Sequence, residues 1–382
     1  MLTSSQFAPL EHSPIGGVTF LVGQNGSGKS TCLAGFAKHA LACGKNVLAI
    51  SNTIYDRFPR RKGSYSELAT RFGRGLPGHV IKHALSIQQE RSERNAERIA
   101  KILDYLGFEM QIGLSIKSTS ARKSDLYERW PDLSSEQYER IESSLNYMQS
   151  RSKHSEDGIL WLDVYGLGHE RNSFGVLDLL RYEGGARNRQ YAAVSVHLRK
   201  RGQTLNVTAA SSGELTLLSM YIYLATHITE GAVILIDEPE NSLHPSWQHE
   251  YCVRLLDMFH LYQPQIVVAT HSPIIVTGAQ GHRLMVEIFQ VHGDTLEHRS
   301  SAHSIEETLY ESFQTLPPAN HYLSERVSEM LDELGRGQLT IGAVQDTLRE
   351  FSKHSYDPSQ RRFLERIEQL AKKVAAEARR KI

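Results

Sequence analysis

The sequence contains little cysteine: Cys32, Cys43 and Cys252 are three of 382 residues. They lie far apart in the chain and form no closely spaced pair of metal ligands. This scarcity excludes a disulfide framework and indicates a reducing compartment. We therefore expect all three to be small buried side chains.

Long apolar runs are also absent, because no stretch approaches the roughly 20 residues that a membrane span needs. The beginning of the chain, MLTSSQFAPLEHSPIGG, lacks the basic start and apolar centre of a signal peptide. We therefore expect a soluble, cytoplasmic protein without a membrane partner.

Neither sign of charge is in excess, since 43 Lys and Arg residues balance 43 Asp and Glu residues. This balance argues against a histone-like or wholly basic nucleic-acid binder, although it leaves room for local basic patches. One cluster contains Arg57, Arg60, Arg61 and Lys62, and another spans Arg199–Arg201. Either cluster could contact nucleic-acid phosphates, and either could be ordinary solvated surface.

A glycine-rich loop stands between an apolar stretch and a helical pattern near the start of the chain. Residues 23–30, GQNGSGKS, match the phosphate-loop pattern G-x-x-x-x-G-K-[ST], and the strand–loop–helix–strand context is the expected one. Glycines let backbone N–H groups point inward around phosphate oxygens, where Lys29 can reach the β- and γ-phosphates and Ser30 can bind Mg²⁺. The predicted nucleotide-binding residues here are Asn25, Gly26, Ser27, Gly28, Lys29, Ser30 and Thr31.

Two later apolar strands end in polar residues that suit the same chemistry. VILIDEP ends in Asp237, a candidate Mg²⁺ ligand, and in Glu238, which could activate the attacking water. VVATHSP ends in His271, whose imidazole could hydrogen-bond the γ-phosphate or the water. The carboxyl ends of strands in an open α/β sheet converge on a bound nucleotide, so these residues should meet there.

A second stretch that could bind phosphate is ASSGELTLLS, residues 210–219. Small polar residues followed by a glutamate and an apolar run predict a helix start, with exposed backbone N–H groups. The candidates here are Ser211, Ser212 and Gly213. One chain would then carry two phosphate sites.

Four motifs follow one another in the chain: the phosphate loop, SSGE, ILIDEP and ATHSP. In this order they resemble the motifs of an ABC-type ATPase of the soluble branch that contains the SMC/Rad50-like and OLD-like proteins. The resemblance implies that two subunits sandwich two ATP molecules with Mg²⁺ in a head-to-tail dimer. Ser211 to Gly213 would be the signature acting on the other subunit's ATP. Glu238 would be the catalytic carboxylate, His271 the switch histidine, and Asn241–His244 the D-loop at the dimer interface.

The chain also resembles the PtuA-like ATPases of Septu and retron anti-phage systems, which act with a separate HNH nuclease. OLD nucleases carry a Toprim domain, but Val286-Glu287 lacks the following glycine and no Asp-x-Asp comes later. The resemblance therefore implies an ATPase that regulates a partner effector, such as a nuclease, in antiviral defence. A DNA-repair or chromosome ATPase that binds DNA remains the alternative, and a transporter subunit is a third reading.

The predicted fold class is α/β, an ABC-type P-loop head with a mainly parallel sheet. The head comprises 1–52 and 190–300, an inserted helical or mixed region covers 53–189, and a helical extension covers 301–382. The polar stretch from Tyr55 to His79 predicts irregular surface, whereas Gly293-Asp294 predicts a hairpin turn. A glutamine loop is not evident, and Asn52 and Gln88 are weak candidates for it.

Overall fold

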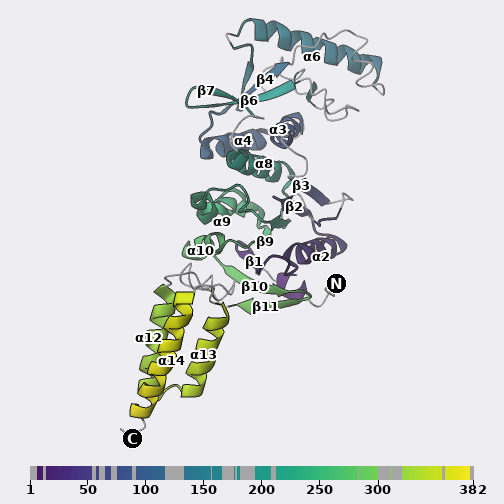
Figure 1. Ribbon diagram of the computed structural model, residues 1–382. Helices are drawn as coiled ribbons and strands as arrows, with labels where there is room; N and C mark the ends of the chain where they lie inside the picture. The colour runs from purple at the N-terminus through teal and green to yellow at the C-terminus, as the bar shows by residue number, and fades with distance from the viewer. Residues whose placement is uncertain are drawn as a thin grey trace.

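The computed structural model describes residues 7–11, 14–53, 57–59, 65–69, 75–87, 92–116, 133–155, 157–165, 176, 179–180, 194–207, 212–282, 284–299, 310, 321–354 and 358–378. From one end to the other, an antiparallel sheet, a larger mainly parallel sheet and a helical bundle follow one another (Figure 1).

The larger sheet has seven strands in the order β11-β10-β1-β9-β8-β2-β3. Its strands are β1 (Val18–Val22), β2 (Val47–Ser51), β3 (Tyr65–Ala69), β8 (Val233–Asp237), β9 (Gln265–Ala269), β10 (Val286–His292) and β11 (Thr295–Arg299). All neighbouring pairs are parallel except β10 with β11, which form the predicted hairpin around Gly293-Asp294. The α/β fold with a mainly parallel sheet is thus confirmed.

The central strands are buried on both faces, so alternate residues supply two cores. One face packs on α2 (Lys29–Ala42) and α1 (Ala8–Glu11). The other packs on α8 (Ser212–His227), α9 (Pro245–Phe259) and α10 (Pro273–Gly281), on the opposite side of the sheet in Figure 1. A short 3₁₀ helix, η4 (His260–Tyr262), follows α9.

β3 was not expected, because its stretch predicted irregular surface. Tyr65, Leu68 and Ala69 are buried, and the strand pairs in parallel with β2 at the edge of the sheet. The prediction was wrong because only five residues form the strand and polar residues flank it on both sides. A short edge strand of this kind carries little periodic signal.

A second sheet has four antiparallel strands in the order β5-β4-β6-β7. They are β4 (Gln111–Ile116), β5 (Leu160–Asp163), β6 (Val194–Lys200) and β7 (Gln203–Asn206). Helices α3 (Leu76–Ile87) and α4 (Ser92–Tyr105) precede β4 in the chain, and α6 (Ser135–Lys153) lies between β4 and β5. The predicted domain boundaries differ from sheet membership at two places. β3, from the predicted insert, joins the large sheet. β6, from the predicted head, pairs with the insert strand β4, and β7 pairs with β6.

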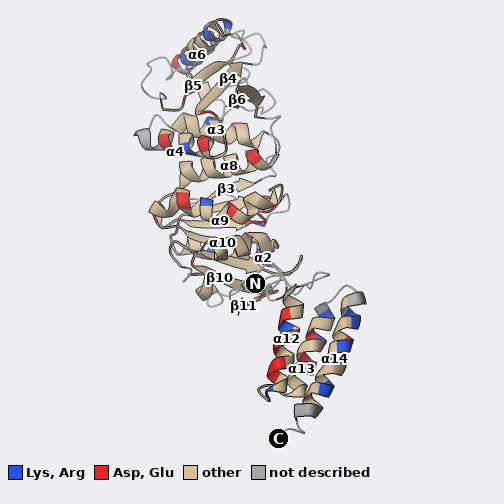
Figure 2. Ribbon diagram, turned by 90° about the vertical axis from the view of Figure 1, so that its left-hand side faces the viewer, with Lys and Arg blue, Asp and Glu red and all other residues tan. Residues whose placement is uncertain are grey.

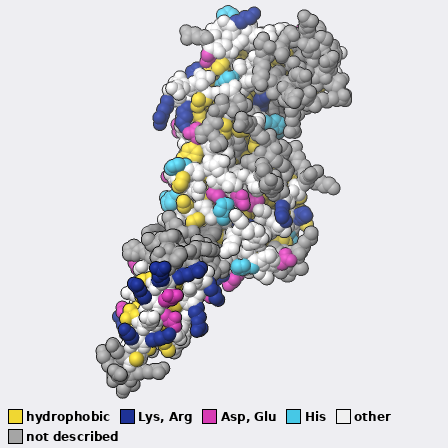
Figure 3. Space-filling view, viewed as in Figure 1, with side chains coloured by type: hydrophobic (Ala, Val, Ile, Leu, Met, Phe, Trp, Pro, Cys, Tyr) yellow, Lys and Arg dark blue, Asp and Glu magenta, His cyan; other side chains and the backbone are white. Residues whose placement is uncertain are grey.

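The last helices are α12 (His321–Gly335), α13 (Ile341–His354) and α14 (Pro358–Ala378), which enclose a separate apolar core. In the ribbon of Figure 2, acidic residues predominate on α12, and Lys and Arg outnumber the acidic residues on α14. Lys and Arg side chains also gather on the bundle in the space-filling view (Figure 3). None of the described helices is both long and apolar enough to cross a bilayer.

Candidate functional site

The phosphate loop connects β1 to α2, as the sequence predicted. Gly23, Gly26 and Gly28 have φ values of 146°, 82° and 103°, which side chains other than glycine rarely adopt. Gly28 caps the N-terminus of α2, so the positive end of the helix dipole faces the loop. Asn25 and Thr31 are exposed at the two ends of this segment, and Ser27 is half-buried between them.

The β10–β11 hairpin supports the loop from one side. Gly293 N–H donates to the Ser27 carbonyl at 3.0 Å. A Cβ on Gly28 would lie 3.2 Å from the Gly293 carbonyl oxygen, so the two turns approach as closely as glycine allows. The loop geometry therefore depends on a hairpin more than 260 residues away in the sequence.

Lys29 is buried at the first position of α2. Its ammonium donates to the carbonyls of Gly23 at 2.8 Å and Gln24 at 3.1 Å, so the loop's own backbone holds it. Burial lowers the pKa of this amine, and the nearby carboxylates of Glu238 and Asp237 oppose that effect. The lysine is thus a preoriented cation that could exchange its carbonyl partners for phosphate oxygens.

Asp237, the last residue of β8, is 1% exposed. Ser30 Oγ donates to its Oδ1 at 3.1 Å, while its Oδ2 is buried without a hydrogen-bond partner among the described residues. Burial raises the pKa of this carboxyl to about 6, the hydrogen bond from Ser30 opposes the rise, and the charge of Glu238 adds to it. An unpaired buried carboxylate oxygen beside a serine hydroxyl fits a Mg²⁺ ion with oxygen ligands.

Glu238 follows Asp237 with a left-handed φ of 52°, a rare conformation for a residue other than glycine. Its N–H donates to the Ala269 carbonyl of β9 at 2.9 Å, which ties the turn to the neighbouring strand. Asn241 Nδ2 donates to Glu238 Oε2 at 3.0 Å. The predicted catalytic carboxylate is therefore positioned by a predicted D-loop residue of the same chain.

Glu240 is a site residue that the motif analysis missed. It is 8% exposed, and its carboxylate accepts from Thr270 Oγ1 at 2.9 Å and from the His271 N–H at 2.7 Å. His271 Nδ1 also lies 3.0 Å from Glu240 Oε1. This carboxylate joins the turn after β8 to the turn after β9 and orients the predicted switch histidine. Its signal in the sequence was the third acid of DEPE.

The signature stretch is described only in part. Ser211 lies outside the described residues, Ser212 begins α8, and Gly213 is buried in its first turn. A Cβ on Gly213 would lie 2.5 Å from the Ser242 carbonyl oxygen, so α8 begins directly against the predicted D-loop. Ser242 itself has a left-handed φ of 69°. These two elements, which the resemblance assigns to a dimer interface, are therefore in direct contact within one chain.

The basic clusters have different surroundings. Arg57 Nη1 donates to Thr31 Oγ1 at 3.0 Å, beside the phosphate loop, whereas Arg60, Arg61 and Lys62 lie outside the described residues.

In the second cluster, Arg199 lies 4.1 Å above the Trp161 ring and Lys200 donates to Glu214 Oε1 at 2.9 Å. These contacts engage both side chains within the chain and tie the start of α8 to the second sheet.

Asn52 and Gln88 are the two candidates for the glutamine loop. Asn52 N–H donates to the Asp237 carbonyl, and its Nδ2 donates to the Pro239 carbonyl at 3.4 Å, so it supports the turn after β8. Gln88 lies outside the described residues. Glu287 lies inside β10 in register with Thr19 of β1, away from the turns that carry the predicted site. The glutamine-loop role stays unassigned.

Known proteins resemble different parts of this chain. Residues 82–277 match the family described as "AAA domain, putative AbiEii toxin, Type IV TA system". The "Retron Ec83 probable ATPase" of Escherichia coli is 34% identical over 95 residues, which are 22% of this chain and 17% of that protein. The chain therefore aligns with only a small part of this relative.

One solved structure, the ADP conformation of MJ1267, an ATP-binding cassette of an ABC transporter, is 14% identical. The alignment covers 78% of this chain and 84% of that one, with a TM-score of 0.31. A score of that size is too low to support an argument about the fold. The family match covers just over half of the chain and includes Asp237, Glu238 and His271. The chain belongs to this AAA family of AbiEii type, and the structure adds the phosphate loop that precedes the matched region.

Proposed function

We propose that the protein binds and hydrolyses ATP with Mg²⁺, in a head-to-tail dimer around two ATP molecules, and thereby regulates a partner effector in antiviral defence. The observation that supports ATP hydrolysis most directly is the convergence of the phosphate loop, Asp237 and the Glu238–Asn241 pair. Family membership supports the same activity.

The residues around the phosphate loop fit a nucleoside triphosphate with Mg²⁺. Lys29 and the loop backbone would hold the triphosphate, and Ser30 with Asp237 would hold Mg²⁺, which would neutralise phosphate charge when bound. Glu238 would accept a proton from the attacking water, because its carboxylate is fixed by Asn241. His271, oriented by Glu240, would hydrogen-bond the γ-phosphate side of the site.

Glu238→Gln tests the catalytic assignment. The variant should retain ATP binding and lose turnover, because an amide cannot accept the proton. Glu230→Gln is the matched control, since Glu230 is an exposed acid in the loop before β8. Fluorescent-nucleotide binding and phosphate release measure the two properties. Unchanged turnover in Glu238→Gln would remove Glu238 from the mechanism.

The dimer proposal rests on the resemblance and on the direct contact between Gly213 of the signature and Ser242 of the D-loop. Lys29→Ala and Ser211→Arg should each be inactive alone. Mixed together they should recover turnover, because a heterodimer unites an intact phosphate loop with an intact signature from the other subunit. Mass measurement shows whether mixed dimers form. If they form and turnover does not recover, the signature does not act on the ATP of the other subunit.

The defence role rests on the relative named "Retron Ec83 probable ATPase" and on the PtuA-like resemblance. The test is to co-express the protein encoded beside this gene and assay nuclease activity with wild-type protein and with Glu238→Gln. An effector whose activity follows the ATP state would support regulation. The regulatory role would be refuted if no nuclease activity is found, or if that activity is the same with wild-type protein and with Glu238→Gln.

A further inference from the structure

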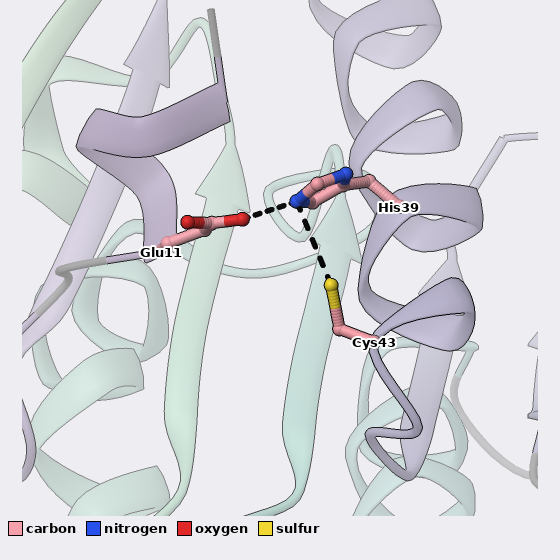
Figure 4. Close-up of side chains that lie close together, drawn as sticks. All are labelled: Glu11, His39 and Cys43. Atoms are coloured by element: carbon pink, nitrogen blue, oxygen red, sulfur yellow. Dashed lines mark hydrogen bonds and ion pairs between the residues drawn. The ribbon is translucent and has the colours of Figure 1, made fainter. Parts of the chain in front are cut away.

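Three side chains with metal-binding chemistry meet where α1 lies against the C-terminal end of α2 (Figure 4). His39 Nε2 contacts Glu11 Oε1 and lies 3.8 Å from Cys43 Sγ. The potential ligand atoms of the three residues all lie within 4.8 Å of one another. His39 lies in the last turn of α2, Cys43 follows four residues later as the C-cap of that helix, and Glu11 comes from α1.

The imidazole of His39 is held in place by two aromatic rings. Phe7 stacks against it with ring centroids 5.5 Å apart, and Phe36 stacks at 6.4 Å. The His39 side chain is only 16% exposed. The two rings therefore hold the imidazole in one orientation before a metal binds. This reduces the conformational entropy that His39 would lose on binding.

The α1 segment is also anchored, so Glu11 is not a loosely attached ligand. Leu10 is fully buried, and its carbonyl accepts from Gln265 at the start of β9. Phe7 packs closely over Gly35 of α2, where a Cβ would lie 2.8 Å from the Phe7 ring. The Glu11 carboxylate is 41% exposed and can adjust to a metal–oxygen bond.

Cys43 differs from the other two cysteines, which corrects the expectation that all three are buried. Cys32 and Cys252 lie inside the cores, and burial raises the pKa of the Cys32 thiol to about 12. Cys43 is exposed at the C-terminal cap of α2. It is therefore the cysteine whose sulfur a metal ion from solvent can reach.

We propose that Glu11, His39 and Cys43 bind a divalent transition metal of the zinc type. A thiolate, an imidazole and a carboxylate are a zinc donor set, and water would complete the tetrahedron. Zinc bonds of about 2.1 Å to nitrogen and 2.3 Å to sulfur imply a nitrogen–sulfur separation of roughly 3.6 Å in a tetrahedral site. The observed 3.8 Å between His39 Nε2 and Cys43 Sγ matches that edge. Glu11 and His39 are in direct hydrogen-bond contact, so the Glu11 carboxylate has to move away from the imidazole when an ion enters between them.

The proposed zinc site is separate from the Mg²⁺ site at Ser30. The two lie at opposite ends of α2, a helix of 14 residues. Such a helix is about 21 Å long. The metal would fasten α1 to α2, the helix that begins at the phosphate loop. The competing explanation is a His39–Glu11 ion pair beside an unrelated thiol.

Zinc binding by the full chain tests the proposal. The protein is stripped with a chelator, saturated with Mg²⁺, and titrated with Zn²⁺ against a chromophoric chelator. We expect about one high-affinity zinc per chain, as a single tetrahedral site implies. Cys43→Ser and His39→Gln should lose it, and Glu11→Gln should weaken it. Lys38→Gln, an exposed neighbour on α2, is the matched control and should bind like wild type.

Alkylation gives an independent readout. Because Cys32 and Cys252 are buried, iodoacetamide should modify Cys43 first in the native protein. Zn²⁺ should slow this reaction, and Lys38→Gln should behave like wild type. The proposal is overturned if no zinc binds, if Cys43→Ser keeps the full zinc stoichiometry, or if Cys43 reacts equally fast with and without Zn²⁺.

Discussion

Asp237→Asn should stabilise the nucleotide-free protein while abolishing Mg²⁺-dependent hydrolysis. Asp237 is 1% exposed, and its ionised form is disfavoured because burial raises the pKa to about 6. Asn has nearly the same shape and no charge. Its oxygen can still accept from Ser30, whose hydroxyl donates to Oδ1. Function and stability therefore oppose each other at this position.

The magnitude follows from proton linkage. The pKa of Asp237 is about 6 in the folded chain against an ordinary value of 3.8, so the folded state binds the proton more tightly. Stability contributed by the protonated form is therefore lost as pH rises from about 4 to about 6. A shift of one unit corresponds to about 1.4 kcal/mol, so ionised Asp237 costs on the order of 3 kcal/mol above pH 7. At pH 5 the cost falls to roughly half of that.

Urea denaturation followed by circular dichroism, at pH 5 and pH 8 without nucleotide, measures the difference. The gain in free energy of unfolding for Asp237→Asn should be larger at pH 8 than at pH 5. The new amide nitrogen, at the Oδ2 position that has no partner among the described residues, should reduce the gain by about 1 kcal/mol, because it is a buried donor without an acceptor. Asp257→Asn, an exposed acid on α9, is the control. A variant that is less stable than wild type at pH 8, or a difference that does not change with pH, would refute the reasoning.

Three further substitutions test neighbouring contacts. Glu240→Gln should lower turnover about tenfold with nearly unchanged ATP affinity, because His271 loses the carboxylate that orients it. Steady-state kinetics measure the turnover and nucleotide titration measures the affinity; wild-type turnover would contradict the prediction. Gly28→Ala should weaken ATP binding and destabilise the chain by about 1–2 kcal/mol, because φ is 103°; calorimetric ATP titration and urea denaturation measure this, and wild-type affinity would contradict it. Gly213→Ala should lower the midpoint of thermal unfolding by roughly 2–4 °C, because the new Cβ would lie 2.5 Å from the Ser242 carbonyl oxygen. An unchanged midpoint would contradict this, because it would mean that the turn at Ser242 moves aside without loss of stability.

The local elements of the head could be predicted from the sequence. Continuous apolar runs marked β1, β8 and β9, and the phosphate-loop pattern placed Lys29 and Ser30 at the start of a helix. The hairpin turn at Gly293-Asp294 was equally evident. These features depend on residues close together in the chain, where periodicity and turn chemistry are informative.

Contacts between distant segments could not be predicted in this way. The hydrogen bonds of Glu240 to Thr270 and His271 depend on β8 lying beside β9, and the assignment of β6 and β7 to the second sheet depends on pairing with β4. Short edge strands such as β3 have too few residues for a periodic signal.

The sequence by itself determined the phosphate loop, the acidic strand end and the histidine that follows the next strand, because each is a local pattern with its own chemistry. Only the tertiary structure decided that one Asp237 oxygen beside Ser30 has no partner in the described part of the chain, and that Glu11 lies close to His39 and Cys43. These contacts between distant residues arise because helices and strands pack to bury their apolar faces, whatever their separation in the chain.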